Sequence, residues 1–171
     1  MRQFSTCAPC DMTREEFINQ FGEVYEHSPW VAEKVFEQGL GEKDNEVEFL
    51  HQRMAKVLIE AEKHQQLDVL CAHPDLAGRA AISGDLSVSS LAEQAGAGLS
   101  QCTTEEFEQF TLYNDLYKSR FNFPFIMAVK GATRKQILDA FNNRIDNDIK
   151  AEFVFALEEV NKIALLRLQD M

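Results

Sequence analysis

Two residues in this sequence combine a chemical type with a position that could serve a functional site, and the first is a histidine. His73 precedes Pro74, and a residue before proline is disfavoured in the α region. His73 is therefore expected at a break between regular elements. An unperturbed imidazole has a pKa of about 6.5 and exchanges protons near neutral pH. His73 is the leading candidate for a general acid or base, with a purely structural histidine as the alternative.

The second is an arginine in phase with an apolar stripe of the predicted C-terminal helix. The stripe consists of Ile149, Phe153, Ala156, Val160 and Ile163. The next helical step reaches Arg167, and burying an unpaired guanidinium is very costly. Two interpretations stay open. Arg167 either extends to the surface at the helix end, where it favours the helix dipole, or points into a pocket that holds an anion or a carboxylate.

A helix predicted to begin at Ser87 has two chemically different faces. The face expected to pack on a core carries Val88, Leu91, Ala92, Ala95 and Leu99. The other face carries Ser90, Glu93, Gln94 and Ala97 at neighbouring helical positions. A hydroxyl, a carboxylate and an amide on one face could bind a polar heterocycle. The alternative is an ordinary solvated surface.

The elements that position these side chains are predicted to be helices. Glycine and proline are scarce, with 8 and 4 residues, whereas all-β chains need many tight turns. Capping-box spacing marks helix starts at Thr13, Thr103 and Thr133. The stretch 28–30 predicts another start, with Ser28 as N-cap and Pro29 in the first turn, and Gly39 is expected to end that helix.

Apolar spacing adds further helices and one ambiguous segment. A long amphipathic helix is predicted from Asn45 onward. After His73, a loop containing Gly78 and Gly84 is expected. A later helix carries an aromatic stripe, made of Phe107, Phe110, Tyr113, Tyr117 and Phe121. The apolar segment 123–129 could be extended or helical, because periodicity does not separate the two.

Length and charge limit the class of protein. The 171 residues suit a single domain, with residues 1–12 expected to be loosely held. The net charge is −11, from 17 basic and 28 acidic residues. This excess of acid argues against a general nucleic-acid binder and against a polybasic membrane anchor. No apolar run approaches the roughly 18 residues of a membrane span.

The cysteines and histidines suggest neither disulfides nor a metal centre. The first residues lack the apolar region of a secretory leader, so a cytoplasmic protein with reduced thiols is expected. Cys7 and Cys10 have redox-motif spacing, but no strand is predicted before them as a thioredoxin-like site requires. The histidines show no HxxxH or HExxH spacing, so no metal site is predicted.

Several of these motifs together resemble the OHCU decarboxylase family. The signature is the His-Pro-Asp-Leu-Ala-Gly run at 73–78 followed by Ser-Leu-Ala-Glu-Gln at 90–94. Similarity extends to 26–30, to 121–125, and to 159–163 with 167–168. The family acts on 2-oxo-4-hydroxy-4-carboxy-5-ureidoimidazoline (OHCU) in urate degradation. The resemblance implies one all-helical domain, a homodimer, a small-molecule substrate, and no metal or organic cofactor.

The resemblance also implies a reaction and the residues that carry it. OHCU would lose CO2 and be protonated to (S)-allantoin. The implied catalytic residues are His73 and Glu93. The implied substrate-binding residues are Pro74, Ser90, Gln94, Arg167 and, through backbone groups of 123–129, Phe125 and Ile126. The peroxisomal tripeptide that ends some animal members does not match the last residues here, which agrees with a cytoplasmic protein.

Two other functions remain open at this point. The aromatic stripe and the acidic composition would also suit a non-enzymatic helical interaction module. A hydrolase of a related ureido compound could use the same acid–base residues. The decarboxylase hypothesis requires His73, Glu93 and Arg167 to converge on one substrate.

Overall fold

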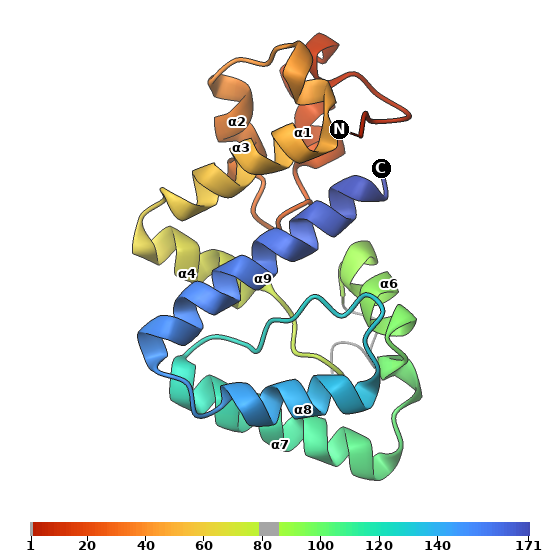
Figure 1. Cartoon of the computed structure of the whole chain (residues 1–171), viewed down its shortest axis with the longest axis vertical. Helices are drawn as coiled ribbons and strands as arrows, with labels where there is room; N and C mark the ends of the chain where they lie inside the picture. The colour runs from red at the N-terminus through yellow and green to blue at the C-terminus, as the bar shows by residue number, and fades with distance from the viewer. Residues whose placement is uncertain (1, 79–85) are drawn as a thin grey trace. The chain divides into compact units, whose positions relative to one another are not determined.

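The computed structural model describes residues 2–78 and 86–171, and its regular structure within them is helical (Figure 1). These residues contain no strand, only an isolated antiparallel bridge between Gln3 and Glu46. The all-α prediction is therefore confirmed over the described ranges. Gly84, expected in the loop after Gly78, lies outside them. The chain divides into two compact units, Met1–Ala72 with Val160–Met171, and His73–Glu159.

The described residues of the first unit contain four α-helices that begin in it, two short 3-10 helices and the last turns of the C-terminal helix. The α-helices are α1 (Arg14–Phe21), α2 (Trp30–Glu37), α3 (Val47–Ile59), α4 (Lys63–Ala72) and the end of α9 (Ile149–Gln169). Phe17, Phe21 and Leu50 are completely buried in its core. The rings of Phe17 and Phe21 lie 4.8 Å apart. The apolar spacing predicted from Asn45 onward thus corresponds to α3.

Helix starts in this unit follow the predicted caps in one case and depart from them in another. The capping box of Thr13 and Glu16 is present at the start of α1. The prediction that Ser28 caps α2 is wrong, because Pro29 occupies the N-cap and no side chain caps the helix. The Ser28 hydroxyl donates instead to the Glu26 carbonyl at 2.9 Å. Between them, His27 has a left-handed φ of 47° that turns the chain.

The N-terminal residues are hydrogen-bonded to the segment that precedes α3. The amide of Phe4 donates to the Asn45 carbonyl at 3.1 Å, and that of Val47 donates to the Arg2 carbonyl at 2.8 Å. Phe4 is buried, with its ring 5.4 Å from that of Phe21. This part of the chain therefore contributes to the core of the first unit.

The second unit is built around an aromatic core. The α-helices among its described residues are α6 (Val88–Gly96), α7 (Thr104–Phe121), α8 (Arg134–Arg144) and the first turns of α9, with a short 3-10 helix at Leu99–Gln101. The predicted capping boxes of Thr103 and Thr133 begin α7 and α8. The aromatic stripe of α7 turns Phe110, Tyr117 and Phe121 into the core. Most of this stripe is therefore internal packing and not an exposed binding surface.

The orientation predicted for α6 is wrong. Val88 is 87% exposed and Leu91 is 44% exposed, and Ala92 and Ala95 are exposed as well. The predicted core face therefore points to solvent, with Leu99 alone buried as expected. The polar face is inward because its amide side chain hydrogen-bonds the backbone of residues 75–77, a partner that apolar periodicity does not reveal.

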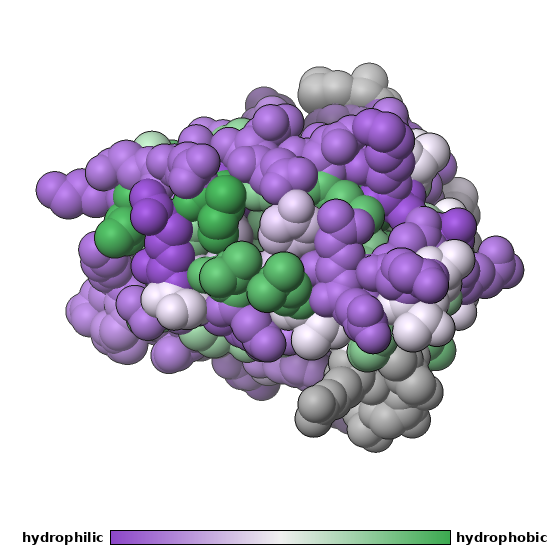
Figure 2. All heavy atoms as spheres, turned by 90° about the horizontal axis from the view of Figure 1, so that it is seen from below, coloured by the Kyte–Doolittle hydropathy of each residue, from purple (hydrophilic) through white to green (hydrophobic). Residues whose placement is uncertain are grey.

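The second unit also exposes apolar side chains on α7. Leu112 is 57% exposed and Leu116, one turn later, is 48% exposed. Figure 2 shows apolar side chains gathered among polar ones on the face that includes this helix. Over the described ranges, none of the helices has the length and apolar character needed to cross a membrane.

Candidate functional site

The predicted break at His73 is present. Helix α4 ends at Ala72, and residues 73–78, which we call the His73 loop, are not helical. His73 is buried, with 8% of its surface exposed. Because proline disfavours the α region for the preceding residue, the helix ends where Pro74 requires. The imidazole is thus placed on an irregular segment and largely shielded from water.

A glutamine of α6 holds the middle of the His73 loop. The Gln94 side-chain amide donates to the Asp75 carbonyl at 3.1 Å, and its oxygen accepts from the Ala77 amide at 3.0 Å. Gln94 is 4% exposed. The two bonds fix the loop against the helix, in the way that a paired strand would satisfy backbone groups.

Two residues of α7 hold the same loop. Asn114 donates to the Leu76 carbonyl at 2.9 Å and is only 2% exposed. The Lys118 ammonium lies 2.6 Å from a carboxylate oxygen of Asp75. These anchors were not predicted from the sequence, because spacing along α7 gives no sign of which distant backbone groups it will meet.

The turn within the loop is tight. Ala77 has a left-handed φ of 51°. A Cβ on Gly78 would lie 2.8 Å from the Cβ of Asp75, closer than real Cβ contacts allow. Glycine at 78 therefore permits the close approach that brings the loop back on itself.

The remaining predicted side chains of α6 lie on or beside the face that meets the loop. Ser90 is 4% exposed and lies one turn before Gln94. Glu93 is partly exposed. The helix begins at the predicted N-cap, where the Ser87 hydroxyl accepts from the Ser90 amide at 3.2 Å. One helix face thus presents a hydroxyl and an amide inward, with a carboxylate at its edge.

The segment 123–129 is neither helix nor strand, and side chains hold its backbone. Arg144 donates from Nη1 to the Ile126 carbonyl at 2.7 Å. The Ala128 amide donates to the Glu159 carboxylate, also at 2.7 Å. The Phe125 ring stacks on Phe141 at 3.7 Å, so its side chain belongs to the core. Any ligand contact at Phe125 would therefore use its backbone.

Behind this segment lies a buried ionic network that sequence reasoning missed. Glu152 has no exposed surface, and it accepts hydrogen bonds from Arg144 Nε at 2.7 Å and from the Tyr117 hydroxyl. Asn147 donates to its other oxygen at 2.8 Å. Burial, with a further contribution from the hydrogen bond to Glu152, raises the pKa of Tyr117 well above its ordinary range.

Arg167 is buried in the first unit and does not extend to the surface. Its Nη2 lies 2.9 Å from a carboxylate oxygen of Glu26, which is 1% exposed. Its Nη1 donates to the Val24 carbonyl at 3.3 Å. The surface interpretation of Arg167 is therefore wrong. The guanidinium pairs with a carboxylate of the chain itself, and a role of Arg167 in a ligand pocket stays a prediction.

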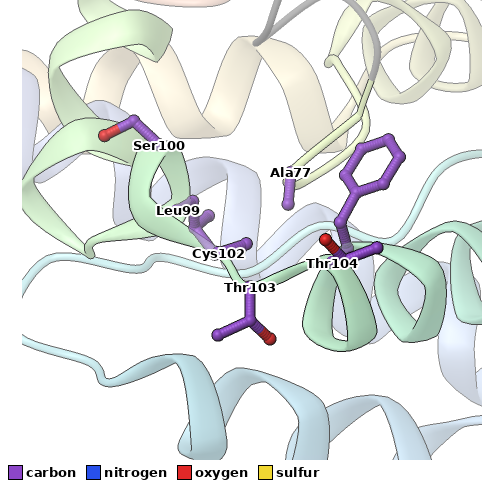
Figure 3. Close-up of a pocket in the computed structure, with 7 residues that line it drawn as sticks. Ala77, Leu99, Ser100, Cys102, Thr103 and Thr104 are labelled. Carbon is purple, nitrogen blue, oxygen red and sulfur yellow. The ribbon is translucent and has the colours of Figure 1, made fainter.

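Two hollows in the second unit border the His73 loop. One, of about 470 Å³, is lined by Ala77 together with residues from Leu99, after α6, to Phe107 in the first turn of α7. In Figure 3 the Ala77 side chain faces Cys102 and Thr104 across this space. The other, of about 400 Å³, is lined by Pro74 and by both α7 anchors. Over the described residues, no group of three or more His, Cys, Asp or Glu could hold a metal ion.

Comparison with known proteins decides the family. The family model described as OHCU decarboxylase matches residues 10–169, a range that includes all the predicted site residues. The chain belongs to the OHCU decarboxylase family. A relative from Halalkalicoccus jeotgali, named 2-oxo-4-hydroxy-4-carboxy-5-ureidoimidazoline decarboxylase, is 40% identical over 92% of this chain and 86% of its own. The protein of the same name from Haloferax volcanii is 39% identical over 91% and 89%.

Two solved structures share the fold. A crystal structure described as (S)-allantoin synthase matches with a TM-score of 0.73 and 30% identity, over 95% of this chain. The chain spans about half of that protein, 52% of its length. A structure of OHCU decarboxylase in the presence of (S)-allantoin matches with a TM-score of 0.70 and 21% identity, which supports the fold alone.

Proposed function

We propose that this protein is an OHCU decarboxylase, a carboxy-lyase that converts OHCU to (S)-allantoin and CO2 in urate degradation. The observation that carries the proposal is the family match, which spans every residue of the site expected from the sequence. The His73 loop held against the inward polar face of α6 supports it independently. A buried imidazole on a loop that a carboxylate-bearing helix holds in place suits proton transfer.

In the proposed reaction the substrate carboxylate leaves as CO2. The electron pair of the broken bond stays on the ring carbon and is delocalised into the conjugated imidazoline. Protonation of that carbon on one face then gives the (S) product. His73 is the proposed general acid–base, and Glu93 hydrogen-bonds the substrate and influences the proton on His73. The protein contributes orientation and charge stabilisation around these groups.

The other predicted residues bind substrate in this proposal. Ser90 binds the ring or ureido edge from the helix face that it shares with Gln94. Gln94 donates one amide proton to the loop backbone and accepts one hydrogen bond from it. A side-chain amide has a second proton and a second lone pair, which can bind substrate. Pro74 and the backbone of Phe125 and Ile126 complete the contacts.

Arg167 is the proposed cation for the substrate carboxylate or ureido oxygen. OHCU is anionic and the chain has a net charge of −11, so the overall field opposes the approach of substrate. A fixed local cation is therefore needed. Glu26 and the Val24 carbonyl orient the planar fork of Arg167, and a guanidinium held in one orientation is suited to recognising a carboxylate.

The direct test is chiral analysis of the product made from freshly generated OHCU. The expected result is faster loss of substrate than in buffer, with release of CO2 and formation of (S)-allantoin. His73→Asn should reduce the rate to the uncatalysed level while the far-UV circular dichroism stays unchanged. Near-normal turnover by His73→Asn would overturn its assignment.

The same experiment separates the remaining alternatives. A hydrolase of a related ureido compound would open the substrate without releasing CO2 and would give no chiral allantoin. A pure interaction module would leave the spontaneous decay unchanged. The homodimer implied by the resemblance and the cytoplasmic location expected from the sequence belong to the proposal too, and sedimentation analysis and fractionation of cells test them.

A further inference from the structure

We infer that Lys118 and Asn114 of α7 are positioning residues that act on His73 through the loop that carries it. This inference rests on the proposed function, because it assigns to His73 the acid–base role proposed above. Neither α7 residue belongs to the site expected from the sequence. Both act on the loop backbone or on Asp75, two residues from the imidazole.

The loop depends on side chains from other elements for its shape. Residues 73–78 form no helix or strand, so their backbone groups cannot be satisfied by regular structure. Gln94 takes up the Asp75 carbonyl and the Ala77 amide. Asn114 takes up the Leu76 carbonyl at 2.9 Å. The turn between Asp75 and Gly78 is therefore fixed from α6 and from α7 together.

Lys118 adds the one charged anchor among these contacts. Its ammonium lies 2.6 Å from Asp75 Oδ2, and the two side chains are 40% and 28% exposed. Asn114 lies one helical turn before Lys118, so both anchors project from the same face of α7. That face also lines the 400 Å³ hollow beside Pro74. Helix α7 therefore fixes the position of the loop backbone and, with it, the orientation of His73.

An effect on catalysis follows from the sensitivity of proton transfer to geometry. A displacement of about 1 Å by a distant mutation can cost up to about a hundredfold in rate. Loss of the Lys118 contact should let the loop shift while Ser90 and Glu93 stay on α6. Chemistry should then slow more than substrate binding, because the proposed binding residues other than Pro74 lie outside the loop.

The experiment compares Lys118→Met, which keeps the apolar stem, with Lys118→Arg, which keeps the charge. The matched control is Lys135→Met, since Lys135 pairs with Asp139 at 2.8 Å on the exposed face of α8. Steady-state decarboxylation of OHCU and thermal unfolding are measured for each. The expected result is a kcat about tenfold lower for Lys118→Met with KM changed less than twofold. Lys118→Arg should retain most of the activity, and Lys135→Met should match the original protein.

A double-mutant cycle with Asp75→Asn makes the test specific to this pair. If Lys118 acts through Asp75, Lys118→Met should have little further effect on kcat once Asp75 is asparagine. Wild-type kcat in Lys118→Met, or additive effects in the cycle, would overturn the inference and leave the proposed function intact. Absence of OHCU decarboxylation by the unmodified protein would overturn both.

Discussion

The buried carboxylate of Glu152 should be the most stabilising charged group of the second unit, and replacing it tests the network directly. Glu152→Gln keeps the shape of the side chain and removes its charge. The Arg144 guanidinium then stays 8% exposed beside a neutral amide. Removing one partner of a buried ion pair typically costs about 3–5 kcal/mol, because the other charge is left uncompensated.

Two further variants give smaller expected losses of unfolding free energy for comparison with Glu152→Gln. Tyr117→Phe removes one hydrogen bond to the carboxylate and leaves the bonds from Arg144 and Asn147 in place. Hydrogen bonds to charged groups contribute about 1.5–3 kcal/mol. Glu33→Gln is the control, because its 3.0 Å pair with Arg14 joins side chains that are 36% and 56% exposed. Exposed pairs contribute less than about 1 kcal/mol.

The assay is equilibrium unfolding in urea at pH 7. For a slope of about 2 kcal/mol per molar, a loss of 3 kcal/mol lowers the midpoint by about 1.5 M. The expected order of destabilisation is Glu152→Gln, then Tyr117→Phe, then Glu33→Gln, with the slope unchanged. If Glu152→Gln costs no more than Glu33→Gln, the pair is hydrated in solution and the stabilising role of the network is refuted.

Three further predictions concern the segment 123–129, Arg167 and the helix caps. Glu159→Ala removes the acceptor of the Ala128 amide and should lower kcat/KM about tenfold, whereas Glu159→Gln should not. The control is Glu158→Ala at an exposed position, and equal kinetics for all three variants would exclude this contact from function. Arg167→Lys keeps a charge but cannot span Glu26 and the Val24 carbonyl together, so kcat/KM should fall at least tenfold, and lost stability with unchanged kinetics would make Arg167 purely structural. The backbone hydrogen bonds from Thr13 and Thr103 lower the pKa of Glu16 and Glu106. A lowered pKa stabilises the fold above the unfolded pKa of about 4.3, and that stability is lost as the pH falls through the folded pKa. The double variant Glu16→Gln with Glu106→Gln should therefore flatten the acid side of the profile of stability against pH, and an unchanged profile would show that the caps do not contribute.

The parts of the fold that sequence predicts are those set by local chemistry. The three capping boxes and the break before Pro74 depend on residues within a few positions of one another, and all are present. The start of α2 shows the limit of this reasoning. Ser28 is a good capping residue by type, but after the left-handed His27 its hydroxyl donates to the Glu26 carbonyl and does not accept from an amide of α2.

The orientation of α6 could not be predicted for a related reason. An amphipathic pattern predicts burial of the apolar face when the helix packs on an apolar core. In this protein the face with Ser90 and Gln94 packs on backbone groups of the His73 loop, and Val88 is left to solvent. A helix that packs on an irregular loop turns its polar face to the loop, because the backbone groups of the loop need hydrogen-bond partners. Inverted polarity of this kind is therefore a sign of a site as much as a failure of prediction.

The buried arginines show what physical reasoning adds when a partner is far away in sequence. A guanidinium in phase with an apolar stripe must find a carboxylate if it is buried, because an unpaired buried charge is too costly. That argument predicts a partner for Arg167 and does not say which of the 28 acidic residues it is. The partner is Glu26, in the segment 26–30 that also resembles the family. The sequence shows two separate signals, a charged residue in phase with an apolar stripe and a short motif 141 positions earlier (167 − 26). In the structure they form one ion pair.

Since the pair is internal to the first unit, Glu26→Gln should destabilise that unit. If Glu26→Gln also changes kcat/KM, the effect of Arg167→Lys on kcat/KM should differ between the Glu26→Gln variant and the original protein.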